Sequence, residues 1–262
     1  MRPSLYYEVH GDTGPFLLLV HGMLSSRAQW MLNLDALSTV CRPVVVELFG
    51  HARSPTPGAP RDYSPEHYIE EFEAIRESLE VERWFICGQS LGATLTLRYA
   101  LEHPDHISGQ VFTNSNSALA DRAWAERVLP LMEAQSRRLE ADGRKALDDH
   151  PLNPGRGRRL PARAREALLA DFALHTVRGI ANTGLYTVPR GSVRERAREF
   201  TVPTMLVAGE REQGFAEACN FAEQSIPGIR VLRLNAGHAV NLEAADEFNR
   251  AVLQFMQSIQ RP

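Results

Sequence analysis

The sequence predicts an α/β protein with a doubly wound, mostly parallel sheet that carries a helical cap insertion. Three observations lead to this fold class. Short apolar runs, typical of strands buried on both faces, recur along the chain, and segments of helical periodicity separate them. The alternation stops in the middle of the chain, where a long stretch shows helical periodicity only. The length of 262 residues suits one α/β core with an inserted cap.

Six apolar runs are short enough to be strands rather than helices. They cover residues 16–20, 43–48, 84–87, 109–113, 204–208 and 230–234. Because helical segments lie between most of these runs, we expect parallel strands joined by helices, as in a doubly wound sheet.

Three helices of the core are marked most clearly. The first covers residues 65–79 and has Pro65 at its first position, where proline is well tolerated. The second covers residues 91–101 and ends before Pro104, which cannot continue a helix. The last covers residues 244–259, where apolar residues recur at helical spacing.

Residues 1–116 and 200–262 are therefore expected to form the core, with residues 117–199 as a helical cap on the carboxyl edge of the sheet. Within the cap, two arginine-rich helical segments flank the loop HPLNPGRGRRLP. We expect the arginines of this loop, Arg156, Arg158 and Arg159, to be a solvated basic cluster. A docking surface for an acidic substrate or carrier is the alternative.

Composition excludes several classes of function. The net charge of -3 and pI of about 6.3 give no attraction toward nucleic acid or an anionic membrane. No stretch approaches the roughly 18 apolar residues of a membrane span, and the N-terminus lacks a secretory layout. Cys41, Cys87 and Cys219 are too few and too far apart for a disulfide framework or a metal motif. We expect a cytoplasmic protein with no metal and no cofactor.

The segment Gly88-Gln89-Ser90-Leu91-Gly92 is a G-x-S-x-G pattern between a predicted strand and a predicted helix. This is the setting of a nucleophile elbow, in which a strained turn lifts the serine hydroxyl above the sheet edge. Side chains at the two glycine positions would collide in so tight a turn. The alternative is a glycine-rich turn whose serine caps the following helix.

A serine nucleophile needs a base, and His238 is the best placed of nine histidines. It follows the last predicted strand, at the edge where parallel strands end and ligands bind. A hydrogen-bonded loop histidine without a catalytic role is the alternative. His103 and His106 flank Pro104 after a predicted helix and are expected at the surface, and the histidines at positions 10, 67, 150 and 175 lie in polar or helical settings without companion signals.

The base must be held in one tautomer by a carboxylate. Such a group should follow the strand at residues 204–208, at the same edge. Glu210 and Glu212 lie there, and no aspartate does. The order serine, acid, histidine is that of the α/β-hydrolase arrangement.

Outside the cap, nearly the whole chain resembles the α/β-hydrolase superfamily. His21-Gly22-Met23 is similar to its oxyanion segment, and residues 50–54 are similar to its G-x-G-x-S turn. Residues 209–212 match its G-x-x-D acid motif with glutamate in place of aspartate, and residues 237–243 match its GH-x(4)-E ending.

The resemblance implies that Glu212, rather than Glu210, is the triad acid. It also implies an oxyanion hole formed by the backbone amides of Met23 and Leu91. The chain departs from the pattern at Ala52, where the family has glycine, and at Glu47, where it has aspartate.

Within the superfamily, the sequence is most similar to the MenH-type synthases of menaquinone biosynthesis and to small esterases. A MenH-type enzyme carries an arginine four residues past the serine, and this chain has Thr94 there. Dehalogenases and epoxide hydrolases have aspartate at the position of Ser90, which argues against both.

The expected activity is therefore hydrolysis of a small, largely apolar carboxylic ester or thioester, with an acyl-enzyme on Ser90. The alternatives are a lyase or cyclisation catalyst with the same triad, and a catalytically silent ligand receptor. Residues expected to line the substrate pocket are Trp30, Met31, Gln89, Trp124, Leu129 and Met132.

Overall fold

The computed structural model describes residues 4–260, and its sheet has seven strands in the order β1-β3-β2-β4-β5-β6-β7. The strands are β1 (Tyr7–Val9), β2 (Phe16–Val20), β3 (Arg42–Val46), β4 (Trp84–Gly88), β5 (Ile107–Thr113), β6 (Thr204–Gly209) and β7 (Arg230–Leu234). Strands β2 to β7 pair in parallel, and β1 pairs antiparallel with β3 at one edge. The predicted α/β fold class is confirmed.

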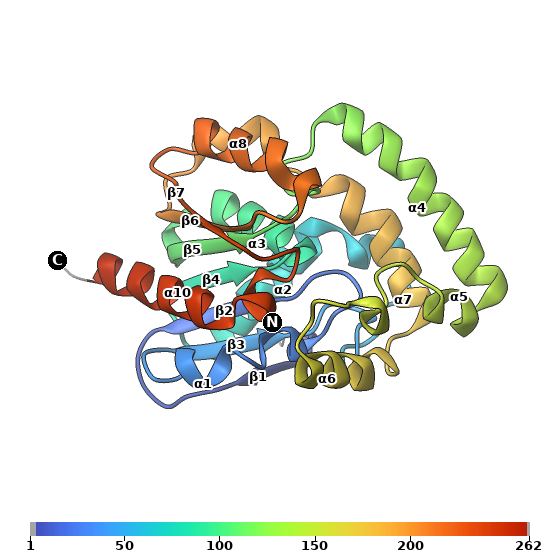
Figure 1. Ribbon diagram of the computed structural model, residues 1–262, viewed down its shortest axis with the longest axis horizontal. Helices are drawn as coiled ribbons and strands as arrows, with labels where there is room; N and C mark the ends of the chain where they lie inside the picture. Colours follow the sequence, from blue (N-terminus) through green and yellow to red (C-terminus); the bar gives the residue numbers. More distant parts are fainter. Residues whose placement is uncertain (1–3, 261–262) are drawn as a thin grey trace.

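Helices cover both faces of the sheet (Figure 1). The apolar residues of α2 (Pro65–Ser78), α3 (Leu91–Glu102) and α8 (Ala216–Ser225) pack with one set of strand side chains. Those of α1 (Leu34–Leu37) and α10 (Ala245–Gln260) pack with the other set. Because β2 and β4 are buried along their whole length, their sequences are apolar throughout instead of alternating.

The parallel register brings four loops to one edge. At the carboxyl ends, Gly88 of β4 pairs with Phe112 of β5, and Gly209 of β6 pairs with Leu234 of β7. The residues that follow these four strands must therefore meet at the same edge. That edge holds the serine, the acidic segment and the histidine singled out above.

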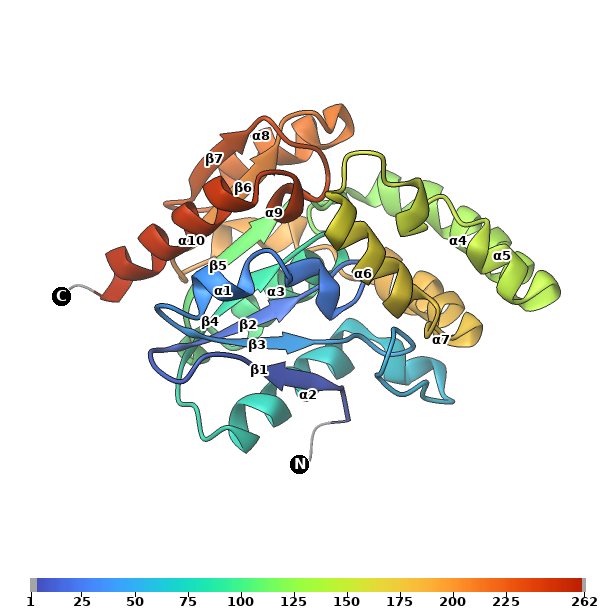
Figure 2. The same ribbon diagram turned by 60° about the horizontal axis from the view of Figure 1, so that its bottom comes forward.

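Between β5 and β6 the described chain is helical and adds no strand to the sheet. It forms α4 (Arg122–Asp142), α5 (Arg144–Asp148), α6 (Ala162–Phe172) and α7 (Val177–Asn182), which gather beyond the carboxyl edge (Figure 2). Gly50 and Gly179 allow α7 to approach the loop after β3, since a methyl group added to either would lie 2.4 Å or less from the Cα atom of the other. No helix within residues 4–260 has the length and apolar character needed to cross a membrane.

Candidate active site

Ser90 occupies a strained turn between β4 and α3. Its φ of 54° is unusual for any residue other than glycine. A methyl group on Gly22 would lie 2.8 Å from the Cβ of Ser90, and one on Gly92 would lie 2.1 Å from the carbonyl oxygen of Val20. Ser90 makes no capping hydrogen bond to α3, whose residues the structure describes in full. The helix-capping alternative is therefore excluded, and the turn has the form of a nucleophile elbow.

The His238 imidazole is joined to a carboxylate. Its Nδ1 lies 2.8 Å from Oε2 of Glu212, and Asn114 Nδ2 donates to the same oxygen at 2.8 Å. Asn114 also pairs with the backbone N–H and carbonyl of Gly209, which fixes the strand from which the acidic segment departs. The side chain of Glu210 is exposed. Geometry therefore brings Glu212, and not Glu210, to the histidine.

The environment favours an ionised Glu212. Burial raises the pKa of this carboxyl, but the hydrogen bonds from His238 and Asn114 outweigh burial and bring the pKa below its usual range. An ionised carboxylate at Nδ1 holds the imidazole with its proton on that nitrogen. The other nitrogen, Nε2, is then available as a base.

Ser90 and His238 open onto the same space. Both line a cavity of about 570 Å³ and a smaller adjoining one of about 130 Å³. Gln89 Nε2 donates to the His238 carbonyl at 3.4 Å, so the two loops are adjacent. The hydroxyl of Ser90 and the imidazole of His238 are not hydrogen-bonded to each other. Such contacts often tighten only when substrate binds.

The backbone amide of Met23 belongs to the turn after β2, and buried imidazoles hold its neighbours on both sides. His21 Nδ1 donates to the carbonyl of Gly22 at 2.7 Å. His51 Nε2 accepts the N–H of Leu24 at 3.1 Å. The orientation of the Met23 amide is therefore set from both flanking residues. Leu91, the other expected donor, begins α3 and lines the 570 Å³ cavity with Met23.

His21, His51 and His175 form a row of buried rings, which we call the histidine row. Ring centroids are 5.2 Å apart for the first pair and 5.1 Å apart for the second. Burial lowers the pKa of His21 to about 3, of His51 to about 4 and of His175 to about 2. Each ring is neutral at physiological pH and accepts a backbone N–H on one nitrogen, from Leu48, Leu24 and Ala52 respectively.

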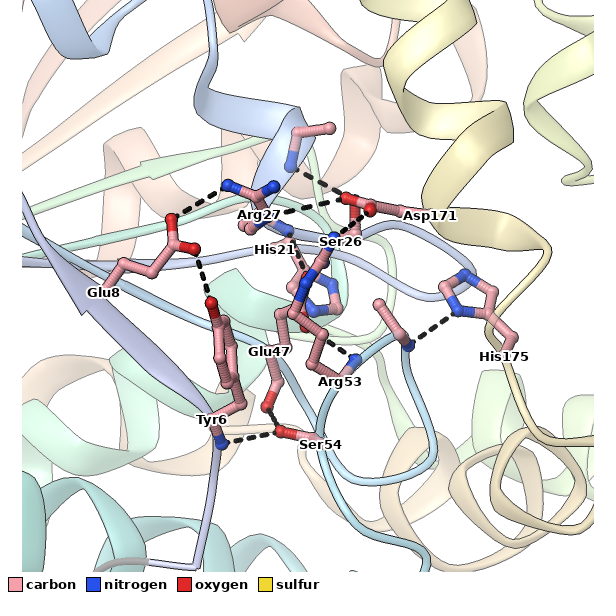
Figure 3. A network of polar contacts seen from close by, with 12 residues as sticks. Tyr6, Glu8, His21, Ser26, Arg27, Glu47, Arg53, Ser54, Asp171 and His175 are labelled. Carbon is pink, nitrogen blue, oxygen red and sulfur yellow. Dashed lines mark hydrogen bonds and ion pairs between the residues drawn. The ribbon is translucent and has the colours of Figure 1, made fainter.

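The segment beyond the sheet is tied to the core by a polar network around Asp171 of α6 (Figure 3). Asp171 Oδ1 accepts from Arg53 Nη2 at 2.8 Å, and Oδ2 accepts from Ser26 Oγ at 2.8 Å. Arg53 Nη1 also donates to the buried carboxylate of Glu47 at 3.0 Å. His175 follows α6 and bonds the loop that carries Arg53. Glu47 and Ala52, at which the sequence departs from the family pattern, thus belong to this network and not to the Ser90 turn.

The surface of the 570 Å³ cavity is more apolar than polar, and two of the expected apolar side chains contribute to it. Trp124 and Met132 of α4 face it, whereas Leu129 is exposed and is not part of its lining. Gln89 lines the smaller adjoining space. Trp30 and Met31 lie elsewhere, which corrects the expectation for both.

Trp30 and Met31 follow the turn after β2, and their side chains enter surroundings other than the 570 Å³ cavity. Trp30 is fully buried in the core beneath α10, with its ring centroid 6.3 Å from that of Phe248. Met31 lines a separate cavity of about 320 Å³, beside Arg27 and Asp171.

Sequence reasoning missed other residues of the site. His150 is buried, lines the large cavity and has a pKa lowered to about 4 by burial. It pairs with Gln135 of α4. Asn114, Asn116 and Ser117 follow β5 at the carboxyl edge, and the polar run after that apolar strand was the signal that could have revealed them.

One group of side chains within residues 4–260 has the composition and spacing of a metal-ligand set. Single ligand atoms of Glu73, His103 and His106 lie within 4.8 Å of one another. The Glu73 carboxylate already accepts from Arg76 at 2.8 and 3.1 Å and from Tyr99. Although burial raises the pKa of Glu73, these hydrogen bonds lower it to about 2. The carboxylate is already neutralised, and a metal ion would have to compete with a guanidinium.

Comparisons with known proteins identify the family of the chain. Residues 15–245 match the model of the family described as alpha/beta hydrolase fold. A protein of Bacillus subtilis (strain 168) that carries the provisional name 2-succinyl-6-hydroxy-2,4-cyclohexadiene-1-carboxylate synthase is 25% identical, over 95% of this chain and 94% of its own. The carboxylesterase YbfK of the same strain is 25% identical, over 92% of this chain and 80% of its own. The structure of MenH from S. aureus superposes with a TM-score of 0.85 at 19% identity, covering 98% of this chain and 99% of that one, and this likeness shows the fold.

Proposed function

Because the chain belongs to the α/β-hydrolase family, we propose that it is a serine hydrolase that cleaves a carboxylic ester or thioester through an acyl-enzyme on Ser90. The observation that carries the proposal is the strained Ser90 turn opening onto one cavity with a histidine that is bonded to a carboxylate. An alcohol is a weak nucleophile at neutral pH, and this arrangement supplies the base that it lacks.

In the proposed mechanism, Ser90 Oγ attacks the acyl carbon while His238 Nε2 takes the hydroxyl proton. The negative charge that develops on the carbonyl oxygen is stabilised by the amides of Met23 and Leu91, each worth about 3 kcal/mol in systems where one donor has been removed. The carbon–oxygen or carbon–sulfur bond then breaks, and His238 returns the proton to the leaving group. Water, deprotonated by His238, releases the acid. Glu212 stabilises the imidazolium in both halves.

Residues 117–199 act in this proposal as a cap that shapes the acyl pocket. Trp124 and Met132 of α4 line the cavity together with Ser90 and present apolar surface to it. Since the lining is more apolar than polar, a short aliphatic or aromatic acyl group would gain most from burial. These side chains and amides supply every group that the reaction needs, so the proposal requires no cofactor or metal.

A lyase of the MenH type is the second candidate, and the relatives named above favour it. Against it, the position that carries arginine in that type holds Thr94, which is fully buried. Its Oγ1 lies 2.8 Å from Ser117 Oγ and 3.1 Å from Ser115 Oγ. Position 94 therefore offers a hydroxyl network and no cation for a carboxylate.

Covalent labelling with a fluorophosphonate tests the nucleophile. We expect one adduct, on the peptide that contains Ser90, which disappears in Ser90→Ala and remains in Ser78→Ala.

Turnover of p-nitrophenyl butyrate in water enriched in oxygen-18 then distinguishes hydrolysis from lyase chemistry. A hydrolase places one heavy oxygen in the butyrate. The proposal would be contradicted if the protein catalysed the elimination reaction of a MenH-type synthase on that enzyme's substrate and hydrolysed no ester or thioester. It would also be contradicted by a correctly folded protein that the fluorophosphonate does not label.

A further inference from the structure

The arginine loop lies against the proposed catalytic imidazole. The sequence alone left two alternatives for its three arginines, a solvated basic cluster and a docking surface. Arg156, Arg158 and Arg159 line a groove of about 420 Å³ that is also bordered by His238. A methyl group added to Gly237, the residue before the histidine, would lie 3.0 Å from Nη1 of Arg159. The cluster is therefore part of the surroundings of the active site.

The charge of this groove is unbalanced. Its lining contains three guanidinium groups and one carboxylate, Glu243, which already accepts the N–H of Gly237 at 2.8 Å. Arg156 approaches Asp149 only to 3.9 Å. Neither Arg158 nor Arg159 has a side-chain hydrogen bond or ion pair within residues 4–260. On a chain of net charge -3, such unpaired positive charge next to the reacting groups favours an anion.

The loop is also held in place, which a solvated basic cluster would not require. Asn153 Nδ2 donates to the carbonyl of Asp148 at 2.8 Å, and its Oδ1 accepts the N–H of Gly155 at 2.8 Å. Pro154 is buried, and Leu160 packs on the small apolar cluster under α6. The arginines thus extend from a turn that is anchored on both sides, so less conformational freedom is lost when they bind a ligand.

The position of the groove relative to the triad indicates which part of a substrate it would meet. It borders His238 but not Ser90, whereas the apolar cavity under α4 borders both. In acyl transfer the leaving group must lie at the imidazole to be protonated, and the acyl group lies on the serine side. We propose that the substrate is an ester or thioester whose leaving alcohol or thiol carries an anionic group, a carboxylate or a phosphate, bound by Arg158 and Arg159. This inference rests on the proposed hydrolase function.

The test uses butyrate esters of three phenols of similar shape: 4-hydroxybenzamide, 4-hydroxybenzoate and 4-hydroxyphenyl phosphate. Arg158 and Arg159 are both exposed, and an exposed guanidinium is worth up to about fivefold in binding. We therefore expect kcat/KM to be about tenfold higher for the charged esters than for the amide, and the advantage to shrink with added salt. The charged ester with the larger advantage identifies carboxylate or phosphate as the bound group. The double variant Arg158→Gln/Arg159→Gln should lose the advantage and keep its rate with the amide, while Arg137→Gln, on the exposed face of α4, should behave as wild type.

Two outcomes would overturn the subsite while leaving the hydrolase intact: equal rates for charged and neutral esters in the wild type, or an equal loss for all three in the double variant. The same holds if the advantage appears only when the charge is on the acyl side, as in the p-nitrophenyl monoester of succinate. Titration of 4-hydroxyphenyl phosphate and 4-hydroxybenzoate into Ser90→Ala needs no turnover. Arginine-dependent binding there, with no ester hydrolysed, would refute the proposed function alone.

Discussion

Replacement of His51 by phenylalanine tests whether the histidine row positions the proposed oxyanion amide. Phenylalanine keeps a flat ring between His21 and His175. In the wild type, His51 Nε2 accepts the N–H of Leu24 at 3.1 Å and Nδ1 donates to the carbonyl of Phe49 at 3.0 Å. Phenylalanine offers neither the acceptor nor the donor, so Leu24 and Phe49 lose these partners. Both residues are 1% exposed, so water does not replace the lost partners.

The expected loss of stability follows from these two groups. A buried backbone group left without a partner costs about 1–3 kcal/mol. The additional apolar surface of phenylalanine offsets part of this cost, and we expect the free energy of unfolding to fall by about 2–4 kcal/mol. For a chain of this size the fall corresponds to about 5–15 °C in Tm. A typical domain retains enough stability to fold after such a loss.

The expected loss of activity is separate from the loss of stability. Removing an oxyanion donor outright lowers kcat by about 100- to 1000-fold. Here the amide of Met23 is displaced rather than removed, so we expect kcat to fall by about 10- to 100-fold. KM should change by less than about twofold, because the interaction is made only in the transition state.

Thermal unfolding and steady-state kinetics on p-nitrophenyl butyrate measure both effects. His51→Gln is the matched rescue, since its amide oxygen reaches the position of Nε2 and should recover most of kcat. His103→Gln, at the end of α3, controls for loss of an imidazole elsewhere. The reasoning is refuted if His51→Phe melts at lower temperature but turns over at the wild-type rate.

Other expectations follow from the same geometry. Glu212→Gln should lower kcat by about 10³- to 10⁴-fold with KM retained, whereas Glu210→Gln should stay near the wild-type rate; the reverse result would reassign the acid. Because the histidine row has folded pKa values of about 2 to 4, the unfolded chain binds more protons below pH 6.5. The contribution of these rings to the free energy of unfolding should therefore be fully present above that pH. It should fall toward pH 4 by up to about 1.4 kcal/mol per pH unit for each ring. Urea unfolding between pH 7.5 and 5 should show a shallower decline in His51→Gln, and an unchanged slope would contradict the assignment. Trp124→Ala should move the optimum of p-nitrophenyl esters toward longer acyl chains, since each added methylene then gains up to about 0.8 kcal/mol of burial; an unchanged chain-length profile would remove Trp124 from the acyl pocket.

Much of the fold could be read from the sequence because parallel strands buried on both faces leave uninterrupted apolar runs. The six expected strands coincide with β2 to β7 to within two residues at each end. Strand β1 was missed because it has three residues, is only partly buried and lies at the edge of the sheet. The segments of the proposed triad were recognisable since each directly follows a strand, where topology alone brings them to one edge.

What could not be read from the sequence depends on contacts between distant segments. Trp30 was expected in the pocket, but α10 supplies Phe248 as its partner more than two hundred residues later. His175 gave no signal because its acceptor role depends on the N–H of Ala52 in another loop. A single imidazole in a polar context looks the same in the sequence whether it is solvated or fully buried.

The contacts that hold the proposed cap also hold the loop behind the proposed oxyanion turn, so the two segments should respond together to a substitution. Asp171 bonds Arg53 and His175 bonds the N–H of Ala52, both in the loop that presents His51 to the amide of Leu24. Asp171→Asn removes a charge from a largely buried ion pair and should lower stability by about 1–3 kcal/mol. If the cap and the turn are coupled, kcat should fall as well, although the substitution lies far from Ser90 in the chain. Glu126→Gln breaks an exposed ion pair with Arg122 at 2.9 Å on α4 and should change neither quantity. A loss of stability in Asp171→Asn with full kcat would show that the cap is anchored independently of the oxyanion turn.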